Sequence, residues 1–205
     1  MKGIARLLIV AGLVVSGLGV AQAQNHHYRD NGDGTVSDLD TGLMWEKKTG
    51  TVNSPPDGYP GLRCRRAKDC PDVHNVNKVY SWSEIGQEIL PEAPNGLVFT
   101  YFLATLNGEV SSDGQTITGC FANHCDWRLP SIDELKTIVD NNVSESEPTI
   151  DAIFGPTIPG GYWSATTWEE GRQSAWTLSF FTAGGGAKPF LKEGLAFVRA
   201  VRGGS

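Results

Sequence analysis

The chain has 205 residues, of which 40% are hydrophobic and 20% charged, and its formal net charge is −6. This length suits a single domain with a substantial hydrophobic core. An acidic chain lacks the positive surface that nucleic-acid binding requires, so we expect no nucleic-acid partner.

The N-terminal residues 1–23 have the features of a secretory signal peptide. Lys2 and Arg6 come before an apolar run at residues 7–20, and Ala-Gln-Ala at residues 21–23 fits a cleavage site. The run is shorter than the roughly 20 residues of a membrane-spanning helix, so we expect cleavage and no stable membrane insertion. The predicted mature domain, residues 24–205, carries a net charge of −8 and is expected in the periplasm, on the cell surface or outside the cell.

Four cysteines form an even count, which in an exported chain favours two disulfides over free thiols. We expect Cys64 to pair with Cys70 and Cys120 with Cys125. Four cysteines permit three pairings, and the sequence does not choose among them.

Residues 28–47 are short apolar runs separated by turn signals. Asn-Gly and Asp-Gly at residues 31–34 supply the positive φ angles of tight hairpins, so we predict a β-meander. The same stretch follows part of the EF-hand pattern, although Arg29 stands where the first carboxylate ligand belongs. A plain turn and a calcium site both remain open, and the candidate ligands are Asn31, Asp33, Thr35 and Asp40.

Residues from about 48 to 79 are rich in Pro, Gly, Asn and charge and show no helical or strand period. We predict a long irregular loop that is cross-linked by the Cys64–Cys70 disulfide. Arg63, Arg65 and Arg66 concentrate basic charge there, which suits an anion such as a sulfated sugar. The alternative is a solvated loop without a ligand.

The middle of the chain contains the helical signals. Short helices are predicted near residues 81–90 and 100–106, and a short strand at 116–118. The clearest signal follows Pro130, where Ser131 and Glu134 have the spacing of a capping box. Apolar residues at 132, 135, 138 and 139 then give a helix one buried face. Arg128, amid apolar neighbours, requires a carboxylate or carbonyl partner.

In the last third of the chain we predict strands at residues 161–168, 174–180 and 195–202, with a glycine turn at 184–186. Arg199 and Arg202 are expected to be polar members of the last strand. Helices in the middle and strands at both ends predict an α+β fold. We expect two or three short helices packed on small antiparallel sheets, with the N- and C-terminal strands together in one sheet.

Five of the six tryptophans divide into two groups. Trp45, Trp127, Trp163 and Trp176 occupy alternating positions and are predicted to lie in the core. Trp168 stands in a polar connection between two strands, where Trp168, Glu169 and Arg172 form a candidate binding group for a sugar ring or a protein partner. A tryptophan folded back onto the domain is the alternative.

Five motifs together resemble one bacterial family, formerly called DUF1566 and now named for the C-terminal domain of the Legionella collagen-like adhesin (Lcl_C). They stand at residues 30–36, 41–45, 126–135, 162–166 and 198–202. The resemblance implies a C-type-lectin-like fold, distantly similar to the formylglycine-generating sulfatase-modifying domain. It also implies an extracellular or envelope domain, in a family with at least one member that binds sulfated glycans. This chain departs from that adhesin because it has no collagen-like repeat and a negative mature charge.

No catalytic constellation is evident. No cysteine follows Cys125, the histidines form no metal-binding helical pair, and no nucleophile elbow or phosphate loop occurs. We therefore predict a non-catalytic binding or adhesion domain without a required cofactor, whose partner is a glycan or an envelope or surface protein. The alternatives are a structural component of a surface appendage or secretion assembly, and a metal-dependent enzyme that uses His124 or residues 30–40. The oligomeric state is not predicted.

Overall fold

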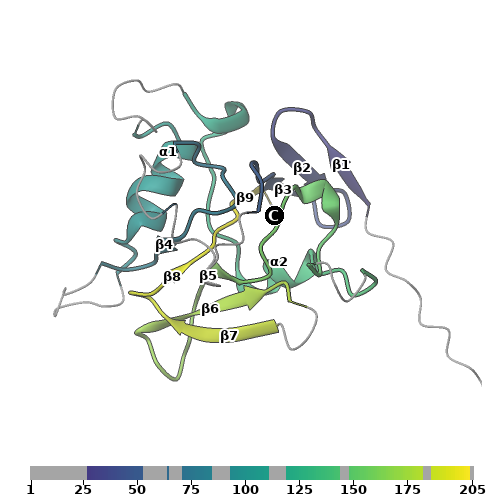
Figure 1. The fold of residues 1–205 in the computed structure, drawn as a ribbon. Coiled ribbons are helices and arrows are strands. Elements are labelled where there is room, and N and C mark those ends of the chain that lie inside the picture. The colour runs from purple at the N-terminus through teal and green to yellow at the C-terminus, as the bar shows by residue number, and fades with distance from the viewer. Residues whose placement is uncertain are drawn as a thin grey trace, which may run out of the picture.

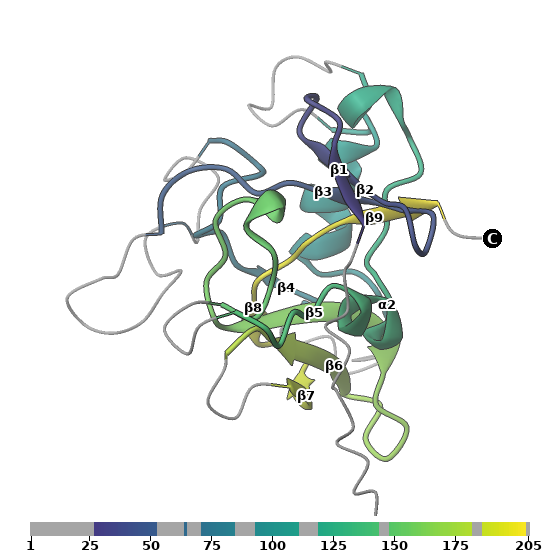
Figure 2. The ribbon, with the colours of Figure 1, turned by 90° about the vertical axis from the view of Figure 1, so that its right-hand side faces the viewer.

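The computed structural model describes residues 27–52, 64, 71–84, 93–110, 119–143, 148–181 and 186–203. Its strands form three antiparallel sheets, and its helices are few and short (Figures 1 and 2). The predicted α+β class is confirmed at this level.

The first sheet joins the two ends of the described chain. β1 (Tyr28–Asp30), β2 (Thr35–Asp38) and β3 (Leu43–Glu46) form the predicted meander, and β9 (Val201–Gly203) adds to β3 in the order β1-β2-β3-β9. Gly32 and Gly34 have φ angles of 77° and 90°, which explains the glycines in the first turn. Figure 2 shows yellow β9 beside the N-terminal strands, so the expected pairing of terminal strands is confirmed.

The second and third sheets lie beside the first. β5 (Gly161–Thr167) and β6 (Ser174–Ser179) occupy nearly the predicted positions, and β7 (Gly186–Leu191) pairs with β6. A two-stranded sheet joins β4 (Tyr80–Ser81) to β8 (Leu195–Ala196). β7 was not predicted, because it contains Pro189. Proline is tolerated there since β7 is an edge strand that pairs only with β6.

The predicted single strand at 195–202 is wrong. The chain leaves β8, makes an isolated bridge from Phe197 to Tyr162, and enters β9 only at Val201. It thereby passes from the sheet of β4 to the sheet of β3. Arg199 lies on this crossing and is fully buried, so its interpretation as a polar member of a strand is also wrong.

Helix α2 (Ile132–Thr137) begins where the capping box predicts. Ser131 Oγ accepts the Glu134 amide at 3.1 Å, and the Glu134 carboxylate accepts the Ser131 amide at 2.7 Å. Arg128 donates to both Glu134 oxygens, at 2.8 and 2.6 Å, and to the Gly203 carbonyl. The predicted partners of Arg128 are therefore confirmed, and they tie the start of α2 to the end of β9.

The other helices are short. A π-helical turn η2 (Val98–Leu103) continues into α1 (Ala104–Leu106), which confirms the helix predicted near residues 100–106. Two 3₁₀ turns, η3 (Phe121–Asn123) and η4 (Ala152–Phe154), follow in the chain. The predicted helix at 81–90 lies largely, and the strand at 116–118 wholly, outside the described residues.

The core consists of two apolar clusters. One packs α2 and the first sheet against β5 and β6, and the other surrounds η2 and α1. Trp45, Trp127 and Trp163 are at most 3% exposed, as predicted for core residues, whereas Trp176 is partly buried. The described parts of residues 48–79 contain only isolated β-bridges, yet Val73, Val76 and Val79 are buried. The end of this segment is therefore part of the core.

Candidate functional site

A polar pocket of about 300 Å³ opens where β5 ends and β6 begins. Thr167, Glu169, Arg172 and Lys192 line it, and we call it the loop pocket. The Trp168 amide donates to the Ser174 carbonyl at 3.0 Å, and the Ser174 amide donates to the Gly171 carbonyl at 2.8 Å. These bonds fold residues 168–173 into a compact turn that presents Glu169 and Arg172 beside the end of β5.

Lys192 forms the fixed part of the loop pocket. Its side chain is buried, with Nζ 3.0 Å from Thr167 Oγ1 and 4.0 Å from the centre of the Trp82 ring. Its backbone also donates to Gln173 and accepts from Trp82 and Ser83. Lys192 holds three segments together and places a cation next to Thr167. Lys192 could not be predicted as part of a site, because it follows the strand that was not predicted.

Trp168 takes a different position from its two neighbours. Its side chain is partly buried, and a Cβ atom added to Gly171 would come within 2.7 Å of the indole ring. The ring therefore lies over the backbone of its own turn, and Trp168 is not among the residues that line the loop pocket. The structure thus brings Glu169 and Arg172 together with Thr167 and Lys192 in the lining of the loop pocket, whereas Trp168 packs on its own turn.

The candidate calcium ligands are only partly brought together. Asn31 and Asp33 lie in the β1–β2 turn, where both bond to Thr35 at the start of β2. Asp40 follows the other end of β2 and contacts His27. The length of β2 separates Asp40 from the first three residues. Among the described residues, no three His, Cys, Asp or Glu side chains are placed to hold a metal ion. Arg63, Arg65 and Arg66 lie outside the described residues.

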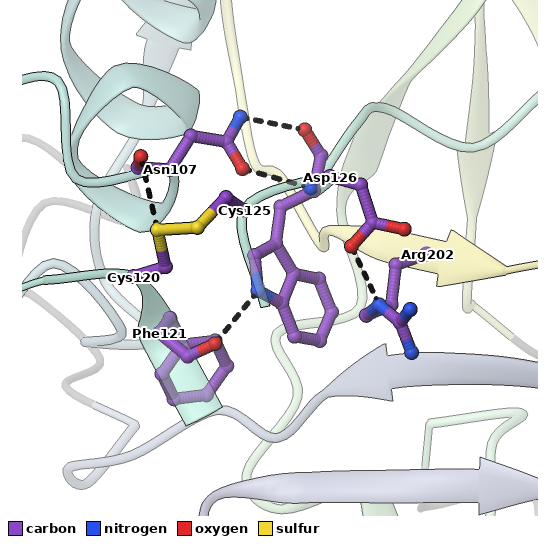
Figure 3. The surroundings of a disulfide bond; sticks show 7 residues. Asn107, Cys120, Phe121, Cys125, Asp126 and Arg202 are labelled. Atoms are coloured by element: carbon purple, nitrogen blue, oxygen red, sulfur yellow. Dashed lines mark hydrogen bonds and ion pairs between the residues drawn. A yellow bond between two sulfur atoms is a disulfide. The ribbon is translucent and has the colours of Figure 1, made fainter. Parts of the chain in front are cut away.

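A disulfide joins Cys120 to Cys125, as predicted. Cys64 is also disulfide-bonded, but its predicted partner Cys70 lies outside the described residues. Figure 3 shows Asn107 beside the closed loop: its side chain donates to the Trp127 carbonyl at 3.0 Å and accepts the Trp127 amide at 2.8 Å. Trp127 Nε1 donates to the Phe121 carbonyl at 3.0 Å. The loop is therefore fastened to the core at both ends.

Replacing both Cys120 and Cys125 by serine is expected to destabilise the domain by about 2 kcal/mol, the loop-closure value for so short a loop. For a chain of this size that corresponds to a melting temperature lower by roughly 4 to 8 °C. Thermal unfolding followed by circular dichroism measures it. An unchanged melting temperature would show that the Asn107 bonds alone order the loop.

A second polar group lies inside the domain, around Glu46 at the end of β3. Glu46 is fully buried, and its Oε1 accepts from Lys48 Nζ at 2.7 Å and from His74 Nδ1 at 2.8 Å. Its Oε2 accepts the Ala200 amide at 3.0 Å. Burial alone would raise the pKa of Glu46, but Lys48 and His74 lower this pKa to about 2. Sequence reasoning missed this group, since its members come from three separate segments.

Within the described residues, no helix has the length and apolar character needed to cross a membrane.

Comparison with known proteins supports the resemblance drawn from the motifs. The family model described as the Lcl C-terminal domain matches residues 34–202, which is most of the chain. Comparisons with the curated proteins and with the solved structures found no match. The matched region begins in the first turn of the meander and ends in β9, so it includes every described helix and strand from β2 to β9 and leaves out β1. The chain belongs to the Lcl C-terminal domain family.

Proposed function

We propose that the chain is an exported, non-catalytic binding domain that recognises a glycan of a cell surface or envelope through the loop pocket. Its family associates it with bacterial surface and adhesin domains. The observation that carries the proposal is the convergence of Thr167, Glu169, Arg172 and Lys192 on one open pocket. The C-type-lectin-like fold implied by the resemblance stays a prediction.

The chemistry of the loop pocket suits a sugar that carries an acidic group. A hydroxyl and a carboxylate can bond to sugar hydroxyls, while the Arg172 guanidinium and the Lys192 ammonium favour a carboxylate or sulfate. Lys192 is already held in place by Thr167 and the Trp82 ring, so little conformational freedom is lost when a ligand binds. The described lining of the pocket has a single carboxylate, and we therefore propose binding that does not depend on calcium.

Arg172→Ala is expected to weaken glycan capture by about tenfold or more, because a charge-assisted hydrogen bond is lost from an exposed position. The measurement is a glycan array that includes neutral, carboxylated and sulfated sugars, run with calcium and again with a chelator. Lys136→Ala is the matched control, since Lys136 is an exposed cation on α2 whose ammonium pairs with Asp133.

Equal binding by the wild type, the Arg172 variant and the control would exclude the loop pocket as the site. A blank array would favour a protein partner from the envelope, and a signal lost with the chelator would contradict the proposal that calcium is not needed.

A further inference from the structure

A second pocket, of about 260 Å³, lies between residues 71–74 and the disulfide loop. Asp72, His74, Thr105, Leu106 and Phe121 are among the residues that line it, and we call it the His74 pocket. None of its described lining residues belongs to the loop pocket. Neither the sequence motifs nor the proposed function makes use of it.

The orientation of His74 is fixed by a buried carboxylate. His74 Nδ1 lies 2.8 Å from Glu46 Oε1, and Glu46 is fully buried whereas the His74 side chain is 18% exposed. The same carboxylate also accepts from Lys48 Nζ and from the Ala200 amide. An ionised carboxylate has no proton to give, so Nδ1 donates its proton to Glu46. The other ring nitrogen, Nε2, lies on the side of the ring away from Glu46.

One part of the lining is the aromatic ring of Phe121, which follows Cys120 of the disulfide. The Phe121 ring lies 4.3 Å from the His74 ring and 5.1 Å from the Trp127 ring, measured between centroids. The next two residues, Ala122 and Asn123, have φ angles of 51° and 61°. Such backbone conformations are costly for residues other than glycine, and they concentrate at binding and catalytic sites.

Two polar groups of the His74 pocket are acceptors. Thr105 Oγ1 gives its own proton to the Tyr101 carbonyl at 2.7 Å, so towards the pocket it can only accept. Asp72 is a carboxylate, which also accepts. A ligand must therefore bring O–H or N–H donors.

The charge of the surroundings argues for a neutral ligand. Apart from His74, Asp72 is the only ionisable side chain among the described residues of the lining, and the buried ammonium groups of Lys48 and Lys78 interact with its charge. Leu106 and Phe121 add an apolar surface that suits C–H groups. A hydroxyl-rich ring with one apolar face meets all of these requirements.

We propose that the His74 pocket binds one neutral monosaccharide unit, as a second site independent of the loop pocket. The probes are free glucose, galactose, mannose and N-acetylglucosamine. Binding is followed by saturation-transfer NMR and by the fluorescence of Trp127, which contacts the Phe121 wall. Free sugars make few contacts, so we expect saturation with a dissociation constant in the millimolar range for at least one of the four.

Two variants locate the binding. His74→Leu and Thr105→Val each remove a polar group from the pocket, and each is expected to weaken the binding of the sugar at least about tenfold. Two variants are used because either change also breaks a bond within the protein; thermal unfolding shows whether each remains folded. Arg172→Ala should bind the neutral sugar as the wild type does.

The proposal is overturned if no sugar gives a saturable signal, or if both folded variants bind like the wild type. It is also overturned if binding is lost in Arg172→Ala, since the sugar would then occupy the loop pocket. Loss of array binding in Arg172→Ala with retained monosaccharide binding would support both sites.

Discussion

Glu46→Gln is expected to lower the free energy of unfolding by about 3 to 5 kcal/mol, the cost of breaking a buried ion pair by removing one partner. The glutamine has nearly the same shape, so the effect comes from charge. Lys48 is 4% exposed, and after the change its ammonium would have no carboxylate beside it. Burial already lowers the pKa of Lys48 although Glu46 opposes this, which shows that the ammonium is costly to bury.

Urea unfolding of the wild type and of Glu46→Gln at pH 7 measures this loss. The double variant Glu46→Gln with Lys48→Met is the control, because it removes both charges and leaves no unpaired ammonium. We expect the double variant to recover much of the stability. A loss below about 1 kcal/mol in the single variant would mean that the carboxylate is not essential to the packing of this region.

The same carboxylate predicts how stability depends on pH. The pKa of Glu46 is lowered in the folded state to about 2 from an ordinary value of 4.5. The contribution of Glu46 is therefore present above about pH 4.5 and is lost as the pH falls towards 2. In Glu46→Gln this part of the acid transition should be missing. An identical acid profile in the two proteins would contradict the lowered pKa.

Local signals in the sequence predicted the structure where neighbouring residues determine it. The capping box of Ser131 and Glu134 predicted the start of α2, and the Asn-Gly and Asp-Gly turns predicted the meander. Both depend on hydrogen bonds or dihedral angles within a few residues. The end of α2 was less clear, since Ile138 and Val139 continue the apolar pattern after the helix stops at Thr137.

Features that depend on contacts between distant parts of the chain were not predicted from the sequence. β7 forms because β6 offers it an edge, which overrides the presence of Pro189. In the loop pocket, the position of Glu169 and Arg172 between two strands indicated their exposure. Lys192 could not be found in the same way, because the fold brings it to Thr167 from 25 residues away. His74 and Glu46 were missed for the same reason.

Arg199 shows most clearly how burial overrides an ordinary residue preference. Its guanidinium donates to the carbonyls of Glu46 and Phe154, at 2.9 and 2.8 Å, and to Thr157 Oγ1 at 3.1 Å. It thereby ties β3 and η4 to the crossing segment that leads into β9. Burial lowers the pKa of Arg199, while Tyr162 and Glu46 oppose that shift.

Arg199→Ala is expected to cost about 3 to 5 kcal/mol, because it leaves a cavity and removes one donor from each of two buried carbonyl groups. Arg202→Ala is the matched control. Arg202 lies three residues later and pairs with Asp126 at 2.7 Å near the surface, so its loss should cost at most about 1 kcal/mol. Denaturant unfolding of the two variants compares them directly. Equal losses would mean that Arg199 contributes no more than a surface ion pair, and that the crossing segment is held by its apolar neighbours alone.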